Sequence, residues 1–146
     1  MNYKYTSIKL GNKHYGAIIN EITERSIIKL NIVENLDKNT NIIINGHQLS
    51  ELSGNNARNF IEIILEFSLA KRIFRETFFV IRELGLSRNI ILGKSFLNSI
   101  GGRITSNREC TTIETDTYFI YLYLTHSSDS DQNPATSRKN KHEYYI

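Results

Sequence analysis

Residues 15–36 read YGAIINEITERSIIKLNIVENL, and this stretch decides the fold. It opens with small and β-branched residues that end at Ile19 and favour a β-strand. After a polar loop, Ser26 leads into residues 27–36, where apolar residues recur at helical spacing and predict a short helix. A strand that ends in a tight loop before a short helix holds a few side chains rigidly at the base of a cleft. We therefore expect the functional position in the loop that begins at Asn20.

The same stretch resembles the catalytic segment of the retropepsins, the aspartic proteases of retroviruses and retrotransposons. That segment reads Ala, two hydrophobic residues, Asp-Thr-Gly and then, after a short gap, Ser followed by hydrophobic residues. Residues 17–19 match its strand and residues 26–28 match its last part. The catalytic triplet differs, because Asn20 stands at the position of the Asp, Glu21 at that of the Thr and Ile22 at that of the Gly.

A second motif, IILGKSFL, occupies residues 90–97. Retropepsin-like domains close their fold with a buried strand that reads hydrophobic-Ile-Leu-Gly and is followed by a helix, so the resemblance implies the same here. Gly93 lacks a β-carbon and lets the start of that helix pack closely under the catalytic loop. Gly101 is a signal for the end of the helix, and a further strand is expected from Arg103.

Together the two motifs predict an all-β, retropepsin-like closed barrel with one or two short helices over residues 1–125. Alternating or β-rich patterns place further strands at residues 3–10, 14–19, 41–45, 60–67, 73–81 and 111–125. A helix over residues 58–75 is the alternative for part of this region, because good helix formers fill it without Gly or Pro. In the family, terminal strands of two protomers interleave, so residues 118–124 form either such a strand or an ordinary core strand.

Two polar segments complete the chain. Residues 50–59 carry a glycine within a polar run, where the resemblance implies a flap over the cleft. The substrate-binding residues expected there are Ser50, Glu51, Leu52, Ser53 and Gly54. Residues 126–146 are polar and contain the only proline of the chain, which predicts a disordered tail.

The altered triplet removes the chemistry that the family uses. A retropepsin needs two carboxylates that share a proton, one from each protomer, so that one activates water and the other binds the scissile carbonyl. An amide such as that of Asn20 neither takes the proton of water nor titrates. Two Glu21 carboxylates at the dimer axis repel each other unless a partner compensates them. Ile22 costs about 1–3 kcal/mol if the loop keeps the conformation that suits a glycine.

Composition limits the other classes of function. The chain has 146 residues and a net charge of +3, with basic residues scattered outside the tail, which argues against nucleic-acid binding as the main role. No apolar run is long enough to span a membrane and no leader opens the chain, so we expect a cytoplasmic protein. A single cysteine excludes an internal disulfide, and four scattered histidines lack metal-ligand spacing, so no cofactor or metal is expected.

The resemblance therefore predicts a retroelement-type protease domain without activity, a pseudoprotease that binds a peptide or polyprotein segment or forms a homodimer. One alternative is a functional aspartic endopeptidase that processes a polyprotein, with Glu21 as a displaced carboxylate. Another is a β-rich interaction module unrelated to proteases. That last alternative predicts that the segments around Asn20 and Gly93 do not lie side by side.

Overall fold

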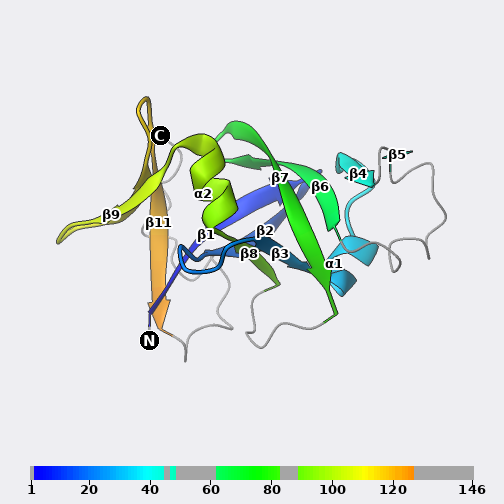
Figure 1. Ribbon diagram of the computed structural model, residues 1–146, viewed down its shortest axis with the longest axis horizontal. Helices are drawn as coiled ribbons and strands as arrows, with labels where there is room; N and C mark the ends of the chain where they lie inside the picture. Colours follow the sequence, from blue (N-terminus) through cyan, green and yellow to red (C-terminus); the bar gives the residue numbers. More distant parts are fainter. Residues whose placement is uncertain (1, 45–46, 49–61, 83–88, 127–146) are drawn as a thin grey trace.

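The computed structural model describes residues 2–44, 47–48, 62–82 and 89–126, which form eleven strands and two helices (Figure 1). In chain order these are β1 (Asn2–Leu10), β2 (Lys13–Ile19), β3 (Ser26–Lys29), α1 (Leu30–Glu34), β4 (Ile42–Ile44), β5 (His47–Gln48), β6 (Glu62–Leu69), β7 (Arg72–Ile81), β8 (Ile90–Leu92), α2 (Lys94–Ile100), β9 (Arg103–Ser106), β10 (Thr111–Glu114) and β11 (Phe119–His126).

Six of the strands close into a barrel. They follow one another in the order β6, β7, β3, β8, β2 and β1, and β1 then pairs with β6 where Lys9 lies opposite Ser68. Strands β4 and β5 extend the sheet from β6, while β11, β10 and β9 extend it from β1, at the other end of the molecule in Figure 1. The prediction of an all-β closed barrel with short helices is confirmed.

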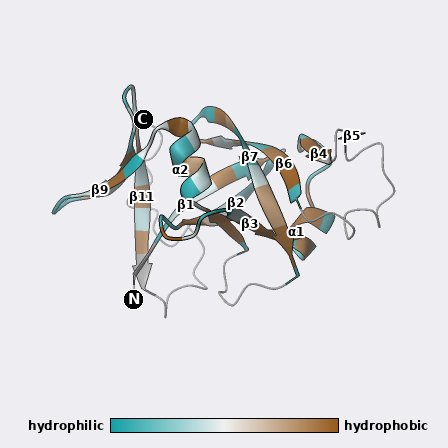
Figure 2. Ribbon diagram, viewed as in Figure 1, coloured by the Kyte–Doolittle hydropathy of each residue, from teal (hydrophilic) through white to brown (hydrophobic). Residues whose placement is uncertain are grey.

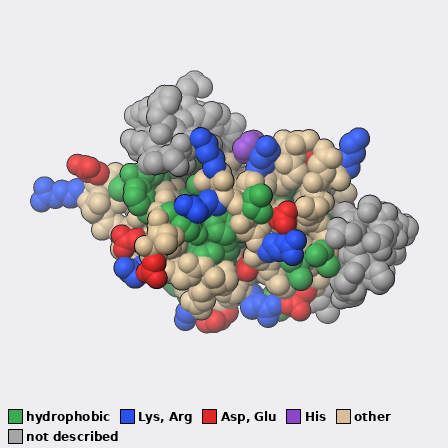
Figure 3. All heavy atoms as spheres, turned by 90° about the horizontal axis from the view of Figure 1, so that it is seen from above, with side chains coloured by type: hydrophobic (Ala, Val, Ile, Leu, Met, Phe, Trp, Pro, Cys, Tyr) green, Lys and Arg blue, Asp and Glu red, His purple; other side chains and the backbone are tan. Residues whose placement is uncertain are grey.

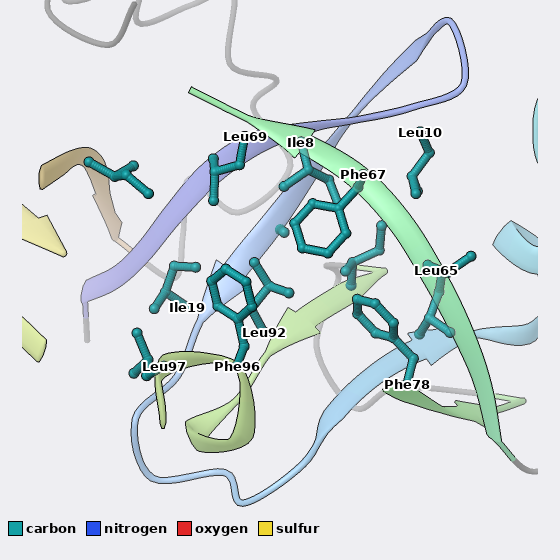
Figure 4. Close-up of a cluster of buried hydrophobic side chains, with 14 of the residues drawn as sticks. Ile8, Leu10, Ile19, Leu65, Phe67, Leu69, Phe78, Leu92, Phe96 and Leu97 are labelled. Carbon is teal, nitrogen blue, oxygen red and sulfur yellow. The ribbon is translucent and has the colours of Figure 1, made fainter. Parts of the chain in front are cut away.

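The interior of the barrel is filled by side chains from alternate residues along the strands. In β6 every second residue is buried, from Ile63 to Leu69, which is the pattern of a strand with one face on a core. The ring of Phe67 lies 6.2 Å from that of Phe78 and 5.8 Å from that of Phe96, which α2 brings in from below (Figure 4). Figure 2 shows hydrophobic residues along the barrel strands and α1, whereas the outer end of β9 is hydrophilic.

The predicted helix over residues 27–36 is wrong in its first part. Residues 26–29 form β3, which runs parallel to β7 and antiparallel to β8, and the helix α1 spans only Leu30–Glu34. Short apolar runs are ambiguous between strand and helix. Here Ile27 and Ile28 find hydrogen-bonded neighbours on both sides, and these non-local pairings decide for the strand.

The helical alternative for residues 58–75 is also excluded over its described part. Strands β6 and β7 form a hairpin in register from Glu62 opposite Phe79 to Leu69 opposite Arg72. The connection is a two-residue turn at Ala70 and Lys71, whose φ angles are 51° and 65°.

The remaining expectations, for the polar segments and the end of the chain, are tested only where residues are described. Residues 111–125 form two antiparallel strands, β10 and β11, rather than one. The expected flap, residues 50–59, lies outside the described residues, as does the expected tail apart from His126, the last residue of β11. Neither helix in the described part of the chain is long and apolar enough to cross a membrane.

Candidate functional site

The two sequence motifs lie side by side in the barrel. Strands β2 and β8 are parallel, with Ile19 opposite Leu92, and the backbone N–H of Asn20 donates to the carbonyl of Leu92 at 3.0 Å. The site loop, residues 20–25, therefore leaves the barrel directly beside the strand that leads to Gly93. This juxtaposition is the opposite of what an unrelated β-rich module predicts.

The site loop then rests on the first turn of α2. The N–H of Lys94 donates to the carbonyl of Thr23 at 2.7 Å, and the N–H of Ser95 donates to the carbonyl of Glu24 at 2.9 Å. The first N–H groups of a helix have no partner within it, and the loop carbonyls satisfy two of them here. The loop and the helix thus fix each other's position.

Gly93 makes this approach possible, as the sequence predicts. A β-carbon built on Gly93 lies 2.6 Å from the carbonyl oxygen of Arg25 and 2.7 Å from that of Thr23. Both neighbours are backbone atoms, and the carbonyl of Thr23 is held by the N–H of Lys94, so they cannot move aside as a flexible side chain does. Any side chain at this position displaces the site loop from the helix.

The side chain of Asn20 is used inside the loop. Its Oδ1 accepts hydrogen bonds from the backbone N–H of Ile22 at 2.9 Å and of Thr23 at 3.3 Å. This is the Asx-turn arrangement by which an Asn or Asp side chain holds its own loop. The amide oxygen therefore performs a structural task, and it offers no group that takes or gives a proton.

The other two residues of the triplet face outward. Oε1 of Glu21 lies 3.7 Å from Nζ of Lys4 on β1, and both side chains are partly exposed. Ile22 is 87% exposed. Only Ala70 and Lys71 have a positive φ among the described residues other than glycine, so Ile22 does not adopt a glycine conformation, and the strain considered from the sequence is not present.

A buried polar network lies beneath the site loop. Ser26 Oγ donates to Oε2 of Glu76 at 2.5 Å and accepts from the N–H of Gly93 at 3.0 Å. Ser95 Oγ donates to the same Glu76 oxygen at 2.7 Å. The network joins β3, β7 and α2 to Gly93, the residue between β8 and α2, and Glu76 is only 7% exposed.

Sequence reasoning missed this network, although one signal for it was present. Glu76 stands between Phe74 and Phe78 in a strand whose alternate residues face inward, so a carboxylate was placed on the core side of β7. A buried carboxylate needs hydrogen-bond donors. The serines of the two motifs are those donors.

Arg25 closes the site loop at its outer side. Its guanidinium forms an ion pair with Glu62 on β6 and lies 4.2 Å from the centre of the Phe79 ring on β7. Next to it, Glu24 and Lys94 form a second ion pair at 3.7 Å between the loop and α2. These contacts are exposed, and they add charge of both signs to the rim of the site.

The overall arrangement matches solved structures although no sequence family is recognised. No family model matches the sequence, and no curated protein matches it. The retroviral protease-like domain of Ddi1 from Leishmania major superposes with a TM-score of 0.59 at 18% identity, covering 88% of this chain and 96% of that one. The fold is retropepsin-like. A retropepsin-like aspartic protease from Rickettsia conorii also matches, with a TM-score of 0.47 and 13% identity over 85% of each chain.

Within this retropepsin-like fold, the predicted site residues divide into two groups. Asn20, Glu21 and Ile22 lie together in the loop between β2 and β3, as the resemblance implies. The expected substrate-binding residues fall outside the described residues; they are Ser50, Glu51, Leu52, Ser53 and Gly54. Within the described ranges, no three His, Cys, Asp or Glu side chains are close enough together to hold a metal ion.

The last strand of the retropepsin-like fold is built into the chain's own sheet. Residues 119–122 of β11 pair with β10, and residues 123–126 pair with β1. Tyr123 stacks on Tyr5 of β1, with ring centres 5.0 Å apart. Of the two roles considered for this segment, these pairings favour a strand of the chain's own sheet.

Proposed function

We propose that this chain is a retroelement-type, retropepsin-like domain without peptidase activity that serves as a scaffold, binding a peptide or polyprotein segment or forming a homodimer. The observation that carries the proposal is the position and use of Asn20. It follows β2 at the point where β8 passes beside it, and its amide oxygen caps the site loop. An aspartic protease requires a titrating carboxylate at this place.

The neighbouring carboxylate does not replace the missing one. Glu21 follows Asn20, and its carboxylate forms an ion pair with Lys4 on β1. A general base must reach the water that it activates within about 3 Å. The described contacts of Glu21 therefore support a role in charge balance.

The same ion pair supports a dimer. Two copies that meet through their site loops, as retropepsin-like protomers do, bring two Glu21 carboxylates together. Lys4 supplies one positive charge for each of them from within the same chain, which reduces the repulsion considered from the sequence alone. The exposed Ile22 adds an apolar side chain at the same surface.

A cleavage assay tests the proposal. Fluorescently labelled casein is incubated between pH 4 and 7 with the wild type, the double variant Glu21→Thr/Ile22→Gly, and the triple variant that adds Asn20→Asp. We expect cleavage by the triple variant alone, blocked by a general aspartic-protease inhibitor. The double variant is the matched control, since it differs from the triple variant only in the carboxylate.

Two results contradict the proposal. Cleavage by the wild type that survives Asn20→Ala and is blocked by the inhibitor favours a displaced catalytic carboxylate, for which Glu21→Gln is the direct test. Cleavage that is independent of the site loop and of the inhibitor assigns the activity to another part of the chain. Sedimentation velocity on the same three proteins reports whether a dimer forms with the native loop.

A further inference from the structure

A second site lies at the other end of β2. A pocket with a volume of about 300 Å³ opens on the outside of the barrel, where β1, β2 and β6 run side by side. Its lining consists of Ser7, Lys9, His14, Ser68, Ala70 and Lys71. His14 is near the start of β2, whereas Asn20 follows the end of that strand, so the two sites are separated by about 20 Å of extended chain.

The closure of the barrel creates this pocket. In β1, Ile8 and Leu10 face the core and are 0% exposed, so Ser7 and Lys9 face outward. Lys9 lies opposite His14 on one side and opposite Ser68 on the other. Three polar side chains from three strands therefore stand in one row across the outer surface.

Most of the side chains that line the pocket can donate hydrogen bonds. Ser7 Oγ lies 3.5 Å from Nδ1 of His14, which ties the hydroxyl and the imidazole together. Ala70 and Lys71, the two residues of the β6–β7 turn, complete the lining, and Lys71 adds a second ammonium group to that of Lys9. Figure 3 shows the face of the molecule seen from above, which carries several Lys and Arg side chains and one histidine, with Asp and Glu side chains on the same face.

The carboxylate of Glu66, on the same strand as Ser68, is engaged elsewhere. Glu66, two residues before Ser68 on the same face of β6, accepts from Asn41 at 2.8 Å and from Arg75 at 3.1 Å. These two hydrogen bonds lower the pKa of Glu66 and keep its charge paired. No Asp or Glu is among the described residues that line the pocket. In the described part of the chain, no Asp or Glu side chain forms an ion pair with Lys9 or Lys71.

We propose that this Lys9–Lys71 pocket binds a phosphate monoester. Two ammonium groups, an imidazole and two hydroxyls surround an opening that is large enough for a phosphate together with the group that carries it. Three phosphate oxygens accept more hydrogen bonds than a single carboxylate, and Lys binds phosphate as a point charge. A pocket confined to one row of strands suits a single phosphate group, since a nucleic-acid strand requires a longer basic surface.

The test follows the imidazole proton signals of His14 by NMR in the full chain at constant ionic strength. Inorganic phosphate and a short phosphoserine peptide are titrated separately, with sodium chloride and the unphosphorylated peptide as blanks. We expect saturable shifts of the His14 signals with a phosphate ligand only. In Lys9→Gln/Lys71→Gln the dissociation constant should rise at least tenfold.

The matched control is Lys29→Gln/Arg108→Gln, which removes the same net charge away from the pocket and should leave the dissociation constant within twofold of the wild type. Tighter binding of the phosphopeptide identifies a phosphorylated protein segment as the source of the phosphate, and equal or tighter binding of inorganic phosphate identifies a small molecule. The proposal is overturned by shifts that do not saturate, by equal shifts with chloride, or by equal losses in both double variants. Tighter binding of a single-stranded oligonucleotide through the same two lysines also overturns it.

Discussion

Ser26 and Glu76 are 50 residues apart in the sequence and share a buried hydrogen bond of 2.5 Å beneath the site loop. Ser95 donates to the same carboxylate oxygen, so one side chain of β7 holds both the start of β3 and the start of α2. The site loop lies between those two elements. Glu76 is therefore a positioning residue for the loop.

Replacement of Glu76 tests this role. Glu76→Leu leaves the buried hydroxyl of Ser26 and the half-buried hydroxyl of Ser95 without their acceptor. Each such loss costs about 1–3 kcal/mol, so we expect the free energy of unfolding to fall by about 2–6 kcal/mol. Glu76→Gln keeps an acceptor oxygen of the same shape and should lose less. Urea unfolding measures both. Equal stability of Glu76→Leu and the wild type contradicts the positioning role.

The contact of the site loop with α2 leads to a second prediction. Gly93→Ala places a β-carbon against two backbone carbonyls. Overpacking of this kind lowers the free energy of unfolding by about 1–3 kcal/mol. Gly16→Ala is the matched control, because a β-carbon there has nothing within 4 Å. We expect the control to be neutral or slightly stabilising in thermal unfolding. Equal effects of the two substitutions would show that the loop moves freely against the helix.

The β6–β7 turn holds two non-glycine residues in an unfavourable backbone conformation, which lowers the stability of the fold. Both central residues have a positive φ, the conformation of a type I′ turn, in which Asn and Gly are preferred. Asn tolerates this region better than Ala does, so Ala70→Asn should stabilise the chain by about 0.5–1 kcal/mol. Ala70→Val, with a branched β-carbon, should destabilise it. The melting temperatures of the two variants are expected to move in opposite directions from that of the wild type.

Asp37 gives the chain a predictable dependence on pH. Its pKa is lowered, first by the N–H of Asn39 at 3.0 Å and then by that of Asn12 at 2.6 Å. Because the folded-state pKa lies below the unfolded value of about 3.9, the stabilisation is fully present above that value and is lost as pH falls through the folded pKa.

Unfolding of the wild type and Asp37→Asn from pH 7 to pH 2 measures this contribution. The stability difference between the two should be constant down to about pH 4 and should shrink below it. Glu24→Gln is the control, since its carboxylate is exposed and, among the described residues, is paired with Lys94 alone. A difference that stays constant down to pH 2 would contradict the assignment to Asp37.

The elements of the fold that could be predicted from the sequence are those that short, local residue patterns specify. The strand before Asn20, the IILG strand and the need for glycine at Gly93 all lie within short segments. Strand β3 was not predictable in this way, because the apolar residues Ile27 and Ile28 fit a helix as well as a strand until their neighbours in β7 and β8 are known. Pairing across the barrel supplies that information.

The same reason explains which parts of the sites were missed. The Ser26–Glu76 hydrogen bond depends on the register of β3 against β7, and the Lys9–Lys71 pocket depends on the contact that closes the barrel between β1 and β6. The turn at Ala70 and Lys71 carries neither Asn nor Gly, so its conformation is imposed by the hairpin register rather than by turn residues.

The ion pair between Lys4 and Glu21 connects the altered triplet to the proposed dimer. If two site loops meet, Lys4→Ala leaves two Glu21 carboxylates without their neighbouring cations, and the dimer should weaken. In a Glu21→Thr background the same substitution should have little effect, because the repelling charges are gone. Sedimentation velocity across a concentration series measures the dissociation constant of all four proteins. We expect at least a fivefold weakening by Lys4→Ala alone and less than twofold in the Glu21→Thr background. Equal effects in both backgrounds would place the dimer contact away from the site loop.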